Sequence, residues 1–210
     1  MAIWLVRHGE TEWSISGQHT GSTDIPLTPE GGLQASAIGR LFAGRRFDHV
    51  FSSPMLRARE TARLAGFGER IRVHEGLAEY DYGEFEGLTT GQIWATHPGW
   101  RLFRDGCPGG ETPGQMAERV DAVIEELREL GGNSLLFGHG HCFRSLAVRF
   151  LNLPILYATN LLLDAGTISI TSDERDGPAL VLWNRRVQPR AMAVADTAAA
   201  IADRSPRHLG

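Results

Sequence analysis

Short apolar runs recur along the chain, separated by longer stretches in which apolar and polar residues mix. Runs with the length of buried strands lie at residues 3–6, 49–51 and 134–137. Two further segments, 167–171 and 179–183, flank a polar turn at 173–177 and are typical of paired strands. These patterns predict five strands.

Three predicted helices begin with the same signal, a Ser or Thr directly before a proline. The hydroxyl side chain caps the helix, and proline suits the first helical position. The pairs are Thr28-Pro29, Ser53-Pro54 and Thr112-Pro113. Apolar residues then recur at helical spacing over 33–41, 56–64 and 116–127. A fourth helix is predicted after the Gly-His-Gly-His segment at 138–141, through Leu146, Val148 and Leu151.

Strands that alternate with helices predict an α/β fold, a three-layer α/β/α sandwich around a mostly parallel central sheet. Ligands bind such sheets beyond the carboxyl ends of the strands. We therefore expect the loops that follow the three buried strands to converge on one crevice. Residues 75–113 are rich in Gly, Trp and acids and lack clean periodicity, which favours a cap insertion over that crevice, in part a lid. The prediction is one domain over residues 1–188, followed by an alanine-rich C-terminal tail at 189–210.

Composition narrows the choice of function. The chain has 210 residues, a formal net charge of −4 and 42 % apolar residues, which fits a globular domain and gives no general attraction for nucleic acid or anionic membranes. An anion site must therefore be local. All 21 basic residues are arginine. The absence of lysine excludes a Walker-type phosphate loop, a Schiff-base enzyme and a lysine general base.

Cysteine usage and the N-terminal sequence predict a cytoplasmic location. Cys107 and Cys142 form no C-x-x-C pair, which fits a reducing compartment. The apolar start of the chain reaches Arg7 too early to be a signal-peptide core, and no apolar run approaches the length of a membrane span. We expect neither a membrane nor a nucleic-acid partner, and the sequence leaves a homodimer open.

The chemistry-bearing residues follow the predicted strands. Arg7 and His8 stand at the end of the first strand. A neutral imidazole can attack phosphorus when its other ring nitrogen is held as a donor, and an arginine fork matches phosphate oxygens. Arg57 falls in the first turn of a helix at a second strand end, and His139 follows a third. Two histidines and two arginines around one spot would offset the charge of a transferring phosphoryl group.

Hydrolysis of a phosphate ester also needs a proton for the leaving alkoxide. The segment after residue 77 offers four acids, and their spacing alone does not choose among them: Glu79, Asp81, Glu84 and Glu86.

Five segments, in order and spread over about residues 3–185, resemble the histidine phosphatase superfamily, also called phosphoglycerate-mutase-like. These segments lie at residues 5–13, 20–28, 53–58, 79–87 and 139–140. The resemblance implies a covalent phosphohistidine mechanism with His8 as the nucleophile. It further implies that Arg7, Arg57 and His139 bind the phosphoryl group. Glu79 would protonate the leaving oxygen and then activate the water that cleaves the phosphohistidine.

Matching positions also imply contacts with the substrate. These come from Thr20, Gly21, Tyr82 and the Gly140 amide. Ser14 stands where many members carry Asn, and its hydroxyl would make the phosphate contact there. Phosphoglycerate mutases carry a lysine where this chain has Thr90, and an arginine-rich insertion that this chain lacks. Without those cations a bisphosphorylated intermediate is poorly held, so hydrolysis is favoured over mutase activity.

Further segments resemble the sedoheptulose-1,7-bisphosphatase group and small bacterial acid phosphatases. They lie at residues 13–21, 79–87, 103–112, 138–141 and 162–166. This resemblance implies a sugar phosphate or another small phosphomonoester as substrate. Arg104, together with the polar loop 105–112, is a candidate contact for the distal end of the substrate; the alternative is that this loop only closes the cap.

The sequence thus favours a metal-independent phosphomonoesterase that acts on a small phosphorylated metabolite, a sugar phosphate or bisphosphate, without a cofactor. A broad-specificity acid phosphatase, a phosphoglycerate mutase, a phosphoprotein phosphatase and a non-catalytic module that binds phosphorylated ligands remain alternatives. A metallophosphatase built on His139 and His141 is disfavoured because the arginines at the strand ends would repel a metal dication.

Overall fold

The computed structural model describes residues 1–187 of the chain. The predicted tail at 189–210 lies outside the described residues. A six-stranded sheet has the order β3-β2-β4-β1-β5-β6. Its strands are β1 (Ala2–Arg7), β2 (His49–Ser52), β3 (Arg72–Val73), β4 (Asn133–Gly138), β5 (Thr167–Glu174) and β6 (Gly177–Arg186). The pairs among β1, β2, β3 and β4 are parallel, whereas β5 and β6 are antiparallel.

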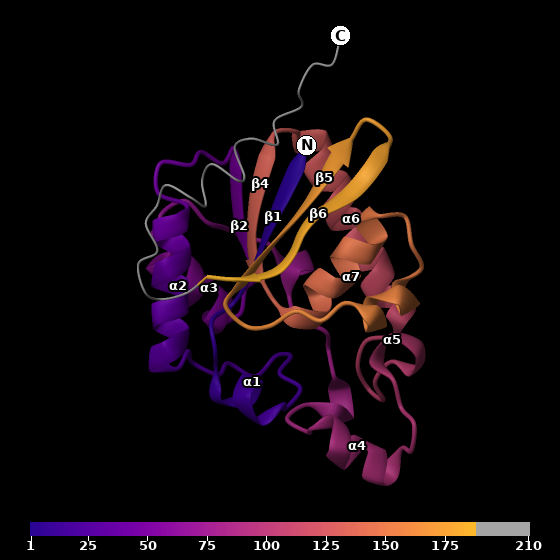
Figure 1. Cartoon of the computed structure of the whole chain (residues 1–210). Coiled ribbons are helices and arrows are strands. Elements are labelled where there is room, and N and C mark those ends of the chain that lie inside the picture. Colours follow the sequence, from indigo (N-terminus) through magenta and orange to yellow (C-terminus); the bar gives the residue numbers. More distant parts are fainter. Residues whose placement is uncertain (188–210) are drawn as a thin grey trace.

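Helices cover both faces of this sheet, as Figure 1 shows. The α-helices are α1 (Glu12–Ser16), α2 (Pro29–Leu41), α3 (Leu56–Leu64), α4 (Thr90–Thr96), α5 (Leu102–Asp105), α6 (Pro113–Leu130) and α7 (Gly140–Phe150). Short 3₁₀ helices are η1 (Glu75–Leu77), η2 (Gly83–Phe85) and η3 (Ile155–Asn160). The predicted three-layer α/β/α sandwich with a mostly parallel sheet is confirmed. The two-residue β3, exposed on both side chains, has no apolar pattern and was not predicted.

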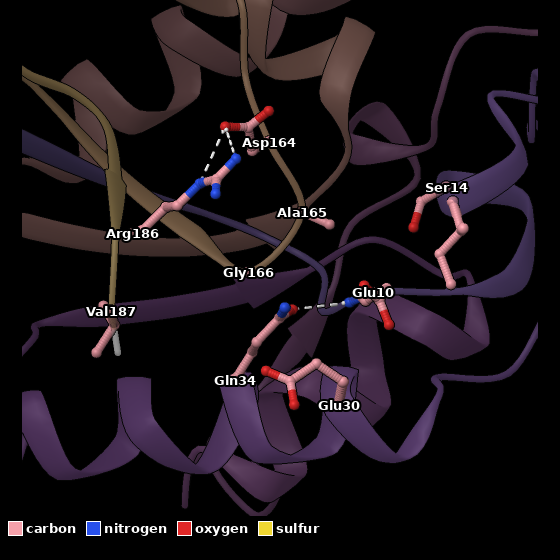
Figure 2. A pocket seen from close by; sticks show the side chains of 10 residues that line it. Glu10, Ser14, Glu30, Gln34, Asp164, Ala165, Gly166, Arg186 and Val187 are labelled. Atoms are coloured by element: carbon pink, nitrogen blue, oxygen red, sulfur yellow. Dashed lines mark hydrogen bonds and ion pairs between the residues drawn. The ribbon is translucent and has the colours of Figure 1, made fainter. Parts of the chain in front are cut away.

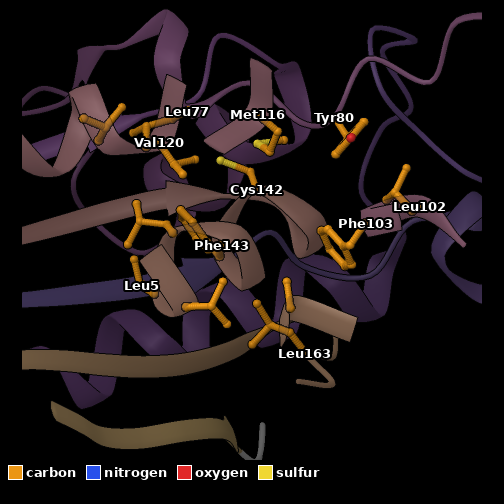
Figure 3. Packing of buried hydrophobic residues seen from close by; sticks show 14 of the residues in the cluster. Leu5, Leu77, Tyr80, Leu102, Phe103, Met116, Val120, Cys142, Phe143 and Leu163 are labelled. Atoms are coloured by element: carbon orange, nitrogen blue, oxygen red, sulfur yellow. The ribbon is translucent and has the colours of Figure 1, made fainter. Parts of the chain in front are cut away.

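Side-chain alternation along β1 divides the core into two clusters. Ile3 and Leu5 point to the cluster shared with α6 and α7, and Trp4 and Val6 to the cluster shared with α2 and α3. Figure 3 shows part of the first cluster, to which both Leu5 of β1 and Phe143 of α7 belong. A strand buried on both faces reads as a continuous apolar run, which is why the sequence pattern located it.

Two of the three predicted helix starts are confirmed. Thr28 and Thr112 are the N-caps of α2 and α6, and each side chain accepts a hydrogen bond from a backbone N–H of the first turn. The third start is wrong: α3 begins at Leu56, and its N-cap is Met55. The Ser53 hydroxyl instead accepts from the Met55 amide and is joined to His139 Nε2 at 2.7 Å, so it serves the site and not the helix.

The register of the parallel strands brings three loops to the same edge of the sheet. Arg7 lies opposite Gly138, and Ser52 opposite Phe137. The residues that follow β1, β2 and β4 therefore meet at one place, as the sequence predicted. In Figure 1, α1 and α4 lie beyond this edge.

Segment 75–113 contains η1, η2, α4 and α5 and leads into α6. Glu79, Tyr82 and Thr90 from this segment line the cavity described below. That it moves as a lid stays a prediction. Over residues 1–187, no helix combines the length and apolar character needed to cross a bilayer.

Candidate active site

A cavity of about 260 Å³ lies at the carboxyl ends of β1 and β4. Its lining residues are Arg7, His8, Trp13, Ser14, Gly17, Gln18, His19, Thr20, Glu79, Tyr82, Thr90, Gly140, His141, Arg144 and Leu163. Seven of the eleven residues that the sequence singled out are in this wall: Arg7, His8, Ser14, Thr20, Glu79, Tyr82 and Gly140. The other four lie behind it or away from it.

His8 is held in a single tautomer. Its Nδ1 lies 2.8 Å from the Gly9 carbonyl oxygen, which can only accept, so Nδ1 carries the proton. Burial, followed by the charges of Arg7 and Arg57, lowers the pKa of His8 well below 6.5. The ring is therefore neutral at pH 7 and keeps its lone pair on Nε2, which makes no hydrogen bond within residues 1–187. This is the state that a nucleophile requires.

Arg7 lies beside the first turn of α7. Its Nη1 donates to the Leu163 carbonyl, while its buried Nε finds no partner among the described residues. A Cβ on Gly140 would come within 3.2 Å of the guanidinium carbon, so a residue without a side chain suits that position. Burial lowers the pKa of Arg7, opposed by the nearby charge of Glu79.

His139 packs against His8 with ring centroids 5.2 Å apart. It is fully buried, and its Nδ1 has no hydrogen-bond partner within the described part of the chain. Burial and the charge of Arg57 lower its pKa well below 6.5. A second neutral imidazole thus stands beside the first, although it is not itself in the cavity wall.

Arg57 is fully buried and holds the loop that follows α1. Its Nη2 donates to the carbonyls of Thr20 and Gly21 at 2.9 and 3.0 Å, and its Nη1 to that of Thr23 at 3.0 Å. The sequence suggested an arginine facing the crevice from a helix N-terminus. In the structure its guanidinium is largely occupied by backbone oxygens, and only Nε is without a partner among the described residues.

Glu79 reaches the start of α7 from a loop without regular structure. Its Oε1 accepts from the amides of Tyr80 and Cys142 at 2.9 and 2.8 Å, and its Oε2 accepts from the His141 amide at 3.0 Å. Of the four candidate acids only Glu79 lines the cavity. Glu86 binds the amides of Gly21 and Thr23 instead, and Asp81 accepts from Gly83.

The structure brings most of the residues expected to contact the substrate into the wall of this cavity. Ser14, Thr20, Tyr82 and Gly140 line the cavity, but Gly21 does not. Arg104 is exposed and bound to its neighbour Asp105 and to the Gly99 carbonyl, so the structure does not bring it to this cavity.

Eight lining residues were not predicted as catalytic or substrate-binding residues, among them His141 and Arg144. The Tyr82 hydroxyl is joined to His141 Nδ1 at 2.5 Å, and burial lowers the pKa of His141 well below 6.5. Arg144 stacks over Phe103 at 4.9 Å and donates to the Ala158 carbonyl, while burial lowers its pKa to about 10, so it stays charged at pH 7. The signal was present: Arg144 stands four residues after Gly140, on the same face of the helix.

A second, larger cavity of about 450 Å³ is lined by residues of α1, α2 and β6 and of the loops next to them (Figure 2). Ser14 lines both cavities. The second one is walled by Glu10, Glu30 and Asp164, of which Asp164 pairs with Arg186 at 2.9 Å. Among residues 1–187 no group of three or more His, Cys, Asp or Glu is placed to hold a metal ion.

The fold and this site define an α/β protein with paired histidines and arginines at the carboxyl ends of parallel strands. Residues 3–186 match the model of the histidine phosphatase superfamily (branch 1), and the chain belongs to this family. It is a phosphatase.

Three similar proteins support this assignment. An acid phosphatase of Mycobacterium tuberculosis is 37 % identical over 91 % of this chain and 96 % of its own. A sedoheptulose 1,7-bisphosphatase of Saccharomyces cerevisiae is 34 % identical over 72 % of this chain and 68 % of its own. A solved structure of an open reading frame product from Mycobacterium tuberculosis has a TM-score of 0.85 and 35 % identity, and the match covers 89 % of this chain and 98 % of that one.

Proposed function

We propose that this chain hydrolyses a small phosphomonoester, a sugar phosphate or bisphosphate, through a phosphohistidine at His8. The observation that carries the proposal is the state of His8: a neutral ring with Nδ1 fixed on the Gly9 carbonyl, beside Arg7 in the cavity wall. This arrangement leaves the Nε2 lone pair as the nucleophile and a guanidinium next to it for the phosphoryl oxygens.

In the first step His8 Nε2 attacks phosphorus, and the bond from phosphorus to the ester oxygen breaks. The leaving oxygen takes a proton from the Glu79 carboxyl group. In the second step the Glu79 carboxylate removes a proton from water, which attacks the phosphoryl group, and the bond between phosphorus and Nε2 breaks. The neutral His8 is restored and inorganic phosphate leaves. No step uses a metal or a cofactor.

The size and charge of the cavity support a small anionic substrate. The cavity volume of about 260 Å³ is slightly below the range of roughly 300–1,000 Å³ that is typical of ligand pockets. A cavity of this size suits a small metabolite better than a phosphopeptide. Arg7 and Arg144 both line it, and neither has a carboxylate ion pair among the described residues. Arg144, in place of Arg104, is therefore the cation available to the distal part of the substrate.

Phosphate release in the presence of EDTA tests this proposal. The panel contains sedoheptulose-1,7-bisphosphate, fructose-1,6-bisphosphate, 3-phosphoglycerate, a phosphopeptide and nitrophenyl phosphate. We expect release from at least one sugar phosphate to be faster than from the phosphopeptide and insensitive to the chelator. Isomerisation of 3-phosphoglycerate without phosphate release would favour the mutase alternative, and silence on all five compounds would favour a binding module.

The variant His8→Ala tests the covalent step directly. Turnover should fall by several orders of magnitude, because the nucleophile is lost while the fold is kept. Rapid quenching of wild type should trap a phosphoryl adduct that is stable to base and labile to acid, and this adduct should be absent from His8→Ala. Substantial activity of the folded variant would overturn the mechanism.

A further inference from the structure

Arg119, on α6, contacts the loop that carries Glu79 and does not line the cavity. Its Nη1 donates to the carbonyls of Gly76 and Ala78 at 2.9 and 2.8 Å, and its Nη2 lies 3.4 Å from the carbonyl of Glu79 itself. One guanidinium thus binds three backbone oxygens within four consecutive residues.

Glu111 completes this arrangement from the end of segment 75–113. Arg119 Nε and Nη2 donate to its two carboxylate oxygens at 2.9 and 2.7 Å, a two-bond fork. The Glu111 amide donates to the Asp81 carbonyl at 2.9 Å. Both side chains are largely buried, with 22 % of Arg119 and 11 % of Glu111 exposed.

The loop between η1 and η2 depends on these contacts. Residues 78–82 belong to no helix or strand, so no ladder of backbone hydrogen bonds fixes them. Arg119 holds the backbone before and at Glu79, and Glu111 holds it two residues later. Beyond the loop, the Glu79 carboxylate must meet the amides of His141 and Cys142 on α7. A shift of about 1 Å in such a group can cost about 100-fold in rate.

We infer that the Arg119–Glu111 pair is a bracket that positions the Glu79 carboxylate for proton transfer. The inference rests on the proposed function, in which Glu79 is the acid and base. Arg119 does not touch the substrate cavity and is a positioning residue. Burial alone would lower the pKa of Arg119, but its bonds to Glu111 raise it above its ordinary value. The Arg119 guanidinium therefore stays charged at neutral pH.

The chain offers a matched control for this bracket. Arg149 on α7 forms the same two-bond fork with Asp121 on α6, at 2.9 and 2.7 Å. Its remaining bond goes to the Leu153 carbonyl, far along the chain from Glu79. Arg119→Met and Arg149→Met each remove one such fork, but only the first releases the Glu79 loop.

The experiment measures the rate of phosphoenzyme formation from two esters: nitrophenyl phosphate, whose leaving group needs little protonation, and the alkyl phosphate that wild type hydrolyses fastest. This rate is measured in place of kcat because Glu79 also acts as the base in hydrolysis of the phosphoenzyme, a step that both esters share. Arg119→Met should lower the rate of phosphoenzyme formation from the alkyl ester about 10- to 100-fold more than from nitrophenyl phosphate. Arg149→Met should leave the ratio of the two rates at the wild-type level, although it also lowers the thermal midpoint. An equal loss of this rate on both esters in Arg119→Met would overturn the inference.

A double mutant separates positioning from general damage. In a Glu79→Gln background the acid is already gone, so adding Arg119→Met should change the alkyl ester rate less than twofold. If Arg119→Met lowers the rate as much in the Glu79→Gln background as in wild type, Arg119 does not act through Glu79. If Arg119→Met does not fold, Arg119→Lys and Glu111→Gln replace it, and the ratio of their rates for the alkyl ester and nitrophenyl phosphate tests the inference. A Glu79→Gln variant with no leaving-group dependence would instead overturn the role proposed for Glu79, and the bracket with it.

Discussion

The protonation state of single residues decides what this site does. His8 is buried and lies near two arginines, Arg7 and Arg57. Burial and the charge of each arginine all lower the pKa of His8. The same cations that would bind a phosphoryl group therefore also keep His8, the proposed nucleophile, uncharged. A histidine at a solvent-exposed position would be partly protonated near pH 6.5 and would lose its lone pair.

Glu79 supplies the most direct test of proton transfer. We expect Glu79→Gln to reduce kcat by about 100-fold or more for alkyl phosphates, because the amide cannot deliver a proton to the leaving oxygen. The glutamine oxygen can still accept from the backbone amides that bond one carboxylate oxygen of Glu79, but its NH2 group cannot accept from those that bond the other. For nitrophenyl phosphate, whose leaving group needs little protonation, the rate of phosphoenzyme formation should fall much less. Phosphate release from both esters, with burst kinetics for the phosphoenzyme, is the measurement. Similar losses in formation of the phosphoenzyme from both esters would contradict the role of Glu79 as acid.

Residue types at strand ends could be predicted from the sequence, but side-chain neighbours could not. Position at a strand end was enough to name Arg7 and His8, and the family resemblance was needed to choose Glu79 among four acids; all three line one cavity. Arg104 and Arg144 show the limit. Both are arginines near apolar segments, and only the packing of Arg144 on Phe103 and its bond to Ala158 place it in the wall. The role of Arg119 could not be predicted for the same reason, since its partners are the Glu111 carboxylate and backbone oxygens of a loop about 40 residues away.

Individual elements begin where local hydrogen bonds satisfy their first amides. The helix starts at Pro29 and Pro113 follow from sequence because each capping threonine acts on its own next residues. Ser53 has the same local signal, yet its hydroxyl is engaged with His139, which is 86 residues away in the chain. A long-range contact thus overrides a local preference, and no pattern within the segment reveals it.

The capping box of α6 carries a prediction for stability. The Thr112 side chain accepts from the Gln115 amide at 3.2 Å, and the Gln115 side chain accepts from the Thr112 amide at 2.9 Å. Thr112→Ala should lower the free energy of unfolding by about 1 kcal/mol, because the first turn of a helix that packs on the core loses an amide partner.

Urea denaturation with Ser36→Ala as the control measures this effect. The substitution Ser36→Ala removes a hydroxyl group within α2 that donates only to the Gly32 carbonyl, one turn earlier in the same helix. The free energy of unfolding of Ser36→Ala should therefore stay within about 0.5 kcal/mol of wild type. Equal unfolding midpoints for Thr112→Ala and wild type would show that the box contributes nothing.

The whole molecule brings together residues that no single element could. The parallel register of β1, β2 and β4 places three loops at one edge, and the two core clusters hold the sheet between α2–α3 and α6–α7. The alternation of strands and helices was sufficient to predict this architecture. The loops of segment 75–113 were not predictable in detail, because their positions depend on contacts with α6 and α7.

Burying several histidines in one site gives the folded protein a pH-dependent stability. His8, His139 and His141 have pKa values lowered well below 6.5, first by burial, and burial lowers that of His19 to about 4. In the unfolded chain these rings titrate near 6.5. Below that pH the unfolded state binds protons that the folded state does not, so stability is fully present above about pH 7 and falls as the pH drops.

Each such ring contributes up to about 1.4 kcal/mol per pH unit below its unfolded pKa, and for His19 this continues down to about pH 4. The free energy of unfolding, measured in urea, should therefore fall steeply between about pH 7 and pH 5. His19→Gln should make that slope shallower by up to one proton. Because the carboxylates with lowered pKa values, such as Asp105 and Glu60, act in the same direction but at lower pH, they cannot cancel the effect. A stability that is flat or rises towards pH 5 would mean that these rings are not held neutral, and the nucleophile proposed at His8 would lose its physical basis.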